Sequence, residues 1–249
     1  MVGALVGAEV RNRALGLDLG QVQDHTALAL VEWERREADG ERVYALRHLE
    51  RLPLGAGYPA IVGHVKELMA SDELHGSTQL VVDATGVGRP VVDMLRQDGL
   101  LPLPVVVHGG RQSTVDALGY HNVPKRVLVS VAQVLLQDRR LRFAASLPLV
   151  KTLEEELLRF EVKITDAGVD TYGAWREGVH DDLVFALCLG TWYGEYRAAL
   201  VAPVFHGKVS RLHEVTEHKR SAAERKFFGP STVDPRTGPK VGRNGVGRF

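Results

Sequence analysis

Cysteine is almost absent from this chain of 249 residues. The single one, Cys188, excludes an intramolecular disulfide framework and a cysteine-based zinc cluster. It stands inside an apolar run, so we expect a small buried side chain. No apolar run reaches the roughly 18 residues that span a membrane, and the apolar N-terminus lacks the basic residues of a signal peptide. We therefore expect a cytoplasmic protein that has no membrane partner.

Net charge is also absent, because 31 basic and 31 acidic residues cancel. The balance hides an asymmetry: residues 1–200 hold 21 Lys or Arg and 27 Asp or Glu, whereas residues 201–249 hold 10 and 4. The second stretch is also rich in glycine and proline, so we expect a basic, flexible C-terminal tail without a core of its own. Such a tail suits a polyanion such as DNA, or it is a solvated terminus without a partner.

The chain is 45% hydrophobic, which fits a globular protein with a real core. Its apolar pattern predicts strands at 14–19, 26–33, 42–49, 79–82, 104–107, 161–164 and 169–174. Helices are predicted at 59–70, 88–97, 124–137, 149–159 and 181–196. Three consecutive strands followed by helices that alternate with strands favour a mixed α/β sheet covered by helices, with the first strand near its centre. We expect an N-terminal extension over 1–13, one domain over 14–200 and the tail over 201–249.

Three short acidic stretches each set a carboxylate against an apolar run. They contain Asp18, Asp83 and the pair Asp181 and Asp182. Burying a charge is costly unless something pairs with it, and hard divalent ions such as Mg²⁺ take carboxylate, water and phosphate oxygens as ligands. We therefore predict an acidic metal site that acts on phosphates, with Asp18 and Asp83 at the ends of neighbouring strands and the pair at the start of a helix.

Within the RNase H-like pattern, these stretches resemble the motifs of the nuclease domain of phage terminase large subunits. Leu17-Asp18-Leu19-Gly20 followed by Asp24-His25-Thr26 is similar to the first motif, Val82-Asp83-Ala84-Thr85-Gly86 to the second, and His180-Asp181-Asp182-Leu183 to the third. A β-hairpin over 161–175, before the last core helix, also matches. The resemblance covers about residues 14–197 and implies an RNase H-like mixed sheet flanked by helices.

The resemblance implies a metal-dependent endonuclease that cleaves double-stranded DNA during viral genome packaging, in the host cytoplasm. Asp18, Asp83, Asp181 and Asp182 carry over as catalytic residues that hold one or two Mg²⁺ or Mn²⁺ ions; which member of the pair is the ligand stays open. No Gly-x-x-x-x-Gly-Lys-Ser/Thr loop occurs, so we expect no ATP site in this chain. A separate packaging ATPase, a portal or other terminase subunits are the implied protein partners. Four cations are candidates to contact DNA phosphates: Lys163, Arg176, Lys208 and Arg211.

Several other interpretations stay open. An Asp-x-Gly on a first strand also opens the actin-like fold of ATP-binding phosphotransferases, and the chain could be a non-catalytic DNA-binding or assembly module, or a RuvC-like junction resolvase. Locally, Asp83 suits an Asx-turn and one of the paired aspartates suits a helix cap. Asp24, His25 and His180 are secondary candidates near the motifs. The run Glu154-Glu155-Glu156 is predicted to be a solvated helix face.

Overall fold

The computed structural model of the chain describes residues 12–20, 24–37, 40–86, 88–160, 162–164, 170–172 and 181–201. The predicted tail therefore lies outside the described residues, apart from Val201. So do the first eleven residues and the tip of the predicted hairpin. None of the helices in the described ranges combines the length and the apolarity that crossing a bilayer requires.

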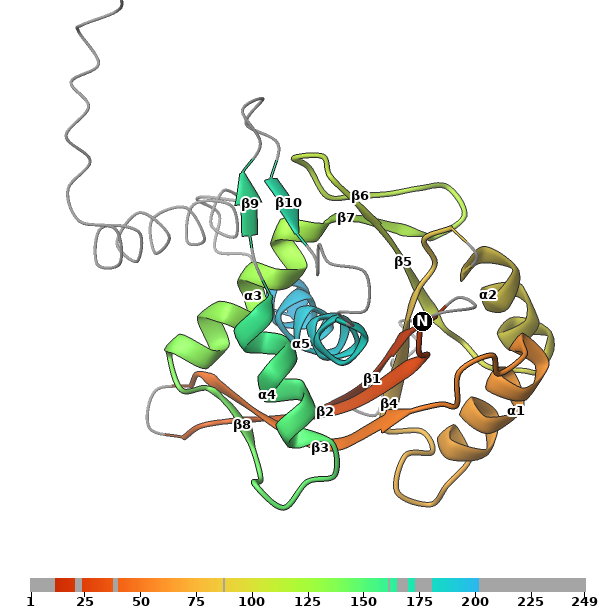
Figure 1. Cartoon of the computed structure of the whole chain (residues 1–249), viewed down its shortest axis with the longest axis horizontal. Helices are drawn as coiled ribbons and strands as arrows, with labels where there is room; N and C mark the ends of the chain where they lie inside the picture. The colour runs from red at the N-terminus through yellow and green to blue at the C-terminus, as the bar shows by residue number, and fades with distance from the viewer. Residues whose placement is uncertain are drawn as a thin grey trace, which may run out of the picture. The chain divides into compact units, whose positions relative to one another are not determined.

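The described residues form a mixed sheet of eight strands in the order β6-β7-β5-β4-β1-β2-β3-β8 (Figure 1). Its strands are β1 (Arg13–Asp18), β2 (Ala27–Arg35), β3 (Arg42–Arg51), β4 (Thr78–Asp83), β5 (Leu103–His108), β6 (Thr114–Val115), β7 (His121–Pro124) and β8 (Leu141–Phe143). The antiparallel meander β1-β2-β3 and the parallel pairing of β1 with β4 place β1 in the interior of the sheet, as predicted. Consequently β1, β3, β4, β5 and β7 all end at the same edge of the sheet.

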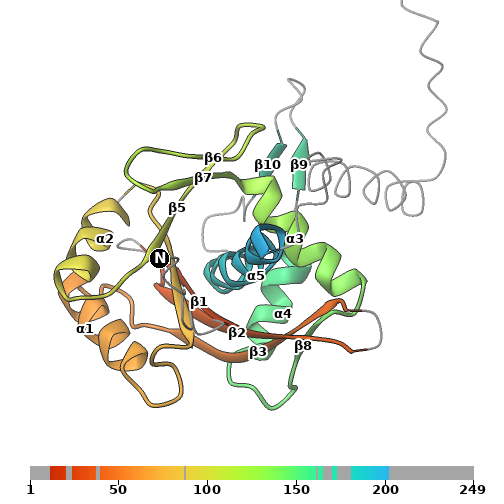
Figure 2. The ribbon, with the colours of Figure 1, turned by 180° about the vertical axis from the view of Figure 1, so that it is seen from behind.

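Helices cover both faces of the sheet (Figures 1 and 2). They are α1 (Tyr58–Met69), α2 (Gly88–Gln97), α3 (Lys125–Gln137), α4 (Val150–Arg159) and α5 (Asp182–Val201). One core lies under α1 and α2 and takes Leu15, Leu17 and Leu80 from the strands. The other lies under α3, α4 and α5 and takes Ala14, Ala29 and Val31. The alternation of neighbouring β1 residues between two cores explains why this strand reads as one continuous apolar run.

Helix α5 approaches the meander closely because glycine stands where the two elements meet. A Cβ atom on Gly16 of β1 would lie 2.0 Å from the carbonyl oxygen of Ala186 in α5, and one on Gly190 would lie 2.9 Å from Val31 Cγ2. Both distances are shorter than van der Waals contact allows. The absent side chains therefore let α5 lie directly on β1 and β2, which brings the start of the helix to the end of β1.

The predicted order of elements is confirmed, with three short strands added. Strands β6, β7 and β8 have two, four and three residues, too few for an alternating pattern to stand out from the sequence. Helix α5 also runs beyond its predicted end, to Val201. The predicted hairpin is formed by β9 (Val162–Ile164) and β10 (Asp170–Tyr172), which pair antiparallel and stand beside α3 (Figures 1 and 2).

Candidate active site

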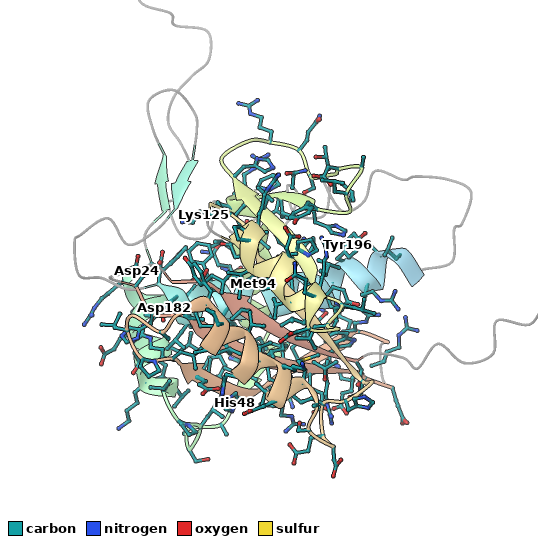
Figure 3. All side chains as sticks on the ribbon, turned by 90° about the vertical axis from the view of Figure 1, so that its right-hand side faces the viewer. Asp24, His48, Met94, Lys125, Asp182 and Tyr196 are labelled. Carbon is teal, nitrogen blue, oxygen red and sulfur yellow. The ribbon has the colours of Figure 1, made fainter. Side chains whose placement is uncertain are left out.

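Carboxylates from all three predicted motifs line one pocket of ≈ 340 Å³ at the edge where the parallel strands end. Asp18 ends β1 and Asp83 ends the neighbouring β4, while Asp181 and Asp182 stand at the start of α5. Asp24 also lines it. Figure 3 shows Asp24 and Asp182 on the same side of the molecule. The fold thus brings the three acidic stretches, which are far apart in the sequence, to one place.

Asp18 occupies an electrostatically unfavourable position for a charged carboxylate. Burial raises the pKa of Asp18 well above its ordinary value, and the neighbouring charges of Asp83, Asp181 and Asp182 raise it further. Lys125 opposes this shift in pKa, but it does not cancel it. Like charges gathered in a poorly solvated place favour either a proton or a cation.

The Asp83 side chain both forms a turn and lines the pocket. Its Oδ1 accepts a hydrogen bond of 2.8 Å from the main-chain N–H of Thr85, so the Asx-turn suggested by the sequence is present. The Thr85 hydroxyl oxygen in turn accepts a bond of 2.9 Å from the N–H of Val107, which fixes this turn to β5. Burial raises the pKa of Asp83, and its hydrogen bonds with Thr85 and the charge of Lys125 partly oppose the rise. The turn therefore orients this carboxylate without removing it from the pocket.

The two aspartates of the third motif have different environments. Asp181 is the N-cap residue of α5, because its carbonyl oxygen accepts the N–H of Phe185 at 2.9 Å. Asp182 is only 4% exposed and receives both arms of the Arg51 guanidinium, with Nε to Oδ2 at 2.7 Å and Nη2 to Oδ1 at 2.9 Å. A bidentate pair of this kind occupies both oxygens of Asp182. Asp181 is therefore the better placed of the two to serve a bound ion.

The prediction that Glu154-Glu155-Glu156 is a solvated helix face is wrong for Glu156 of α4. Glu154 and Glu155 are exposed, but Glu156 is 6% exposed and pairs with Arg51. Its Oε2 also accepts the main-chain N–H of Val184 at 3.1 Å, in the first turn of α5. Burial and the charge of Asp182 raise the pKa of Glu156 to about 7. The sequence held a signal for this, because Glu156 follows the buried Val150 and Leu153 at intervals of three.

Lys125, at the first position of α3, is the pocket residue that the sequence reasoning missed. Its Nζ lies 4.3 Å from the ring centre of Phe185, which also lines the pocket. Burial lowers the pKa of Lys125, while the charges of Asp181, Asp18 and Asp83 act in the opposite direction. The three motifs mark acids and give no sign of this cation. Only the fold places the residue after β7 beside the ends of β1 and β4.

The other residues predicted from the sequence either have a local structural role or lie outside the described residues. The ring nitrogen Nδ1 of His25 lies 2.9 Å from the carbonyl oxygen of Leu52, which indicates a role in holding the loop after β1. Arg176, His180, Lys208 and Arg211 lie outside the described residues, and the structure describes only the backbone of Lys163. The predicted DNA contacts of Lys163, Arg176, Lys208 and Arg211 therefore stay predictions.

The donor atoms of the pocket are those that a hard divalent ion uses. In the described part of the chain, however, no three His, Cys, Asp or Glu side chains are grouped closely enough to coordinate an ion by themselves. Mg²⁺ commonly takes only one or two carboxylates and fills its other positions with water and substrate phosphate. The residues present therefore fit an open site of this type and do not form a closed cage.

A larger hollow, of ≈ 570 Å³, lies over β2, β3 and β8 and is remote from the acidic motifs. It contains Glu32 and Arg47, which pair with each other at 2.7 Å. Of these two hollows, the smaller is the candidate site, because there Asp18 and Asp83, whose pKa values are raised, lie with a lysine.

Comparison with solved structures shows the fold. The large terminase nuclease from thermophilic phage G20c with bound magnesium aligns with 72% of this chain and 79% of its own, at 24% identity and a TM-score of 0.53. A second structure of the same nuclease aligns at 23% identity and a TM-score of 0.52, over 71% of this chain and 79% of that one. No family model and no curated protein matches the sequence. The chain has the RNase H-like α/β fold of large terminase nuclease domains.

Proposed function

We propose that the chain is a divalent-metal-dependent endonuclease that cleaves double-stranded DNA, in the manner of terminase-type genome packaging. The observation that carries the proposal is the convergence of Asp18, Asp83 and Asp181 with Lys125 in one pocket. The likeness in fold to a terminase nuclease crystallised with magnesium supports it. A packaging ATPase, a portal and other terminase subunits are the corresponding proposed partners.

Asp18, Asp83 and Asp181 are the residues that would hold one or two Mg²⁺ or Mn²⁺ ions. When bound, such ions activate a water for attack on the phosphodiester and stabilise the leaving oxygen. The raised pKa of Asp18 supports this role, because a cation relieves the same repulsion that a proton would relieve. Asp24, an exposed residue that lines the pocket, is a further candidate ligand.

The other residues of the pocket position and balance these acids. The Asx-turn of Thr85 fixes the rotamer of Asp83, and the ion pair with Arg51 holds Asp182. Lys125 supplies a positive charge that neutralises part of the acidic cluster and can bind a non-bridging phosphate oxygen of the substrate. Asp182 thus acts through the placement of α5, and Asp181 acts at the ion.

Plasmid cleavage under a titration of Mg²⁺ or Mn²⁺ tests the proposal. The wild-type chain should cut only when a divalent ion is present, and Asp18→Asn and Asp181→Asn should each lose at least about 100-fold in rate, which corresponds to a loss of about 3 kcal/mol of transition-state stabilisation. Glu67→Gln, which changes one exposed acid on α1, is the matched control and should cut normally. Cleavage by Asp18→Asn at the wild-type rate would refute the assignment.

The same assay separates the two aspartates of the third motif. Asp182→Asn leaves Arg51 paired with Glu156, so we expect a folded protein that loses no more than about tenfold in rate, within the range of changes to residues behind a metal ligand. If Asp182→Asn is as inactive as Asp181→Asn, Asp182 is itself a ligand. If both variants cut normally, the third motif is not part of the site.

A further inference from the structure

Two arginines belong to the same chain segments as Lys125 of the pocket or are bonded to them. Strands β5 and β7 run parallel with His108 opposite Pro124, so the chain leaves both strands at the same edge of the sheet. Arg111 follows β5, and Lys125 and Arg126 open the helix that follows β7. A hydrogen bond of 2.9 Å from Arg126 Nη2 to the carbonyl oxygen of Arg111 joins the two segments. We call Arg111, Lys125 and Arg126 the basic edge.

The two arginines of the basic edge have no carboxylate counter-ion among the described residues, unlike several other arginines of the domain. Arg13 and Arg47 share Glu32, Arg51 binds Asp182, and Arg140 binds Glu195. Among the described residues, by contrast, no carboxylate lies within ion-pair distance of Arg111 or Arg126, whereas Lys125 faces the acids of the pocket. Arg111 is exposed and Arg126 is half-buried, so both guanidinium groups are accessible to a ligand outside the pocket.

The position of these charges on α3 is locally unfavourable. The first turn of α3 contains no acidic residue and has no side-chain cap. Lys125 and Arg126 stand there instead, at the positive end of the helix dipole, where a cation costs roughly 0.3–1 kcal/mol. Sequences that depart from a local rule in this way do so mainly at functional sites. An anion beside α3 would remove the cost.

We propose that Arg111 and Arg126 bind backbone phosphates of the DNA strand that is cut, next to the phosphate that enters the pocket at Lys125. This inference rests on the proposed function and adds the path that the DNA substrate takes across the protein. Arginine binds phosphate oxygens through two donors at once. Such contacts fix the register of the strand over the pocket and carry no base specificity.

Binding to a 30-base-pair duplex in EDTA, followed by fluorescence anisotropy over a series of salt concentrations, tests the basic edge without any cleavage. R111Q/R126Q should lose roughly tenfold in affinity, and the slope of log affinity against log salt should become shallower by about 2, since each phosphate contact contributes about 0.9. The single variant R111Q should reduce the slope by about 1. The loss should be the same for duplexes of different sequence.

Two variants keep the test falsifiable. R35Q/R142Q removes two exposed arginines on β2 and β8 and should bind as the wild type does. R111K/R126K keeps both charges and should restore most of the salt slope. Unchanged binding by R111Q/R126Q, or an equal loss in R35Q/R142Q, would overturn the proposal. Because the assay needs no metal and no cutting, a chain that binds through the basic edge but never cleaves would refute the nuclease proposal and leave this one standing.

Discussion

The carboxyl group of Asp18 is half-buried and lies among like charges. Its pKa is raised by burial first and then by Asp83, Asp181 and Asp182. The native state therefore holds a proton on Asp18 at pH values where the unfolded chain, with a pKa of about 3.9, has released it. The contribution of Asp18 to the free energy of unfolding is fully present below the pKa of the unfolded chain. It is lost as the pH rises through the raised pKa of the native state.

We expect Asp18→Asn to be more stable than the wild type in metal-free buffer at pH 7, and equally stable near pH 4, because asparagine carries no charge to be repelled. Thermal melts in EDTA across this range measure the difference. For a protein of this size, about 1 kcal/mol corresponds to roughly 2–4 °C in Tm. Adding Mg²⁺ should then raise the Tm of the wild type and not that of Asp18→Asn, because only an intact site binds the ion.

The prediction would be contradicted if Asp18→Asn were less stable than the wild type at pH 7 while the two proteins were equally stable near pH 4. That outcome would mean that the charged Asp18 carboxylate is stabilised in the fold, by a partner that outweighs its acidic neighbours. Glu67→Gln, which changes an exposed acid on α1, is the control variant for these melts.

At the scale of single residues, the sequence indicated the acidic residues of the candidate site but not the basic residues that lie beside them. Asp18, Asp83 and Asp181 stand next to apolar runs, so their convergence at one edge of the core could be anticipated. Lys125 and Arg51 carry no such local mark. They belong to the site because β7 and β3 end at the same edge as β1, which is a property of strand order and not of residue spacing.

At the scale of elements, the contact between β1 and α5 sets the geometry of the pocket. Asp18 lies two residues beyond Gly16, and Gly16 lies against the main chain of Ala186. Any side chain at Gly16 would push the helix away from the strand. The distance between Asp18 and Asp181 therefore depends on a residue that takes no part in the chemistry.

Gly16→Ala should accordingly destabilise the protein. The new Cβ would lie 2.0 Å from a main-chain oxygen that cannot rotate away, and overpacking of this kind costs about 1–3 kcal/mol or more. Chemical denaturation measures the loss. Gly63→Ala in α1 is the matched control, because nothing lies within 4 Å of its added Cβ, and it should be neutral or more stable by up to about 1 kcal/mol. Equal stability of Gly16→Ala and the wild type would show that α5 can shift freely.

The elements themselves were predictable where their patterns were long. The meander and the buried α5 each carry at least six patterned residues, and the structure confirms them. The strands β6, β7 and β8 owe their conformation to neighbours that are distant in the sequence. Tertiary pairing decides such short segments, so propensity alone could not reveal them.

At the scale of the whole molecule, charge is distributed unevenly along the chain. Residues 1–200 carry 21 basic and 27 acidic groups, and residues 201–249 carry 10 and 4. An acidic body repels DNA at long range, so cations elsewhere must offset the repulsion. The basic edge acts beside the pocket, and the predicted tail would act over a longer distance.

Deleting residues 202–249 should leave a folded protein, because α5 is kept whole. Its affinity for duplex DNA should fall and its salt slope should become shallower, since the deleted stretch holds ten basic residues. Cleavage at saturating DNA should change little. Anisotropy and plasmid cleavage on the same preparation measure both quantities.

Unchanged affinity and salt slope would show that residues 202–249 make no contact with DNA. Unfolding of the shortened chain would instead show that they pack against the domain. Combined with R111Q/R126Q, the deletion should weaken binding by about the sum of the two free-energy losses, because separate sites act additively.

The joining of β1 to α5 has a consequence for the order of events during synthesis. Ribosomes release Asp18 and Asp83 before Asp181, which follows only with the last described helix. Until α5 has left the ribosome and settled against Gly16, the nascent chain lacks one wall of the pocket. Under the proposed function, a chain that still lacks α5 is therefore harmless to DNA, and competence to cut follows the docking of this helix.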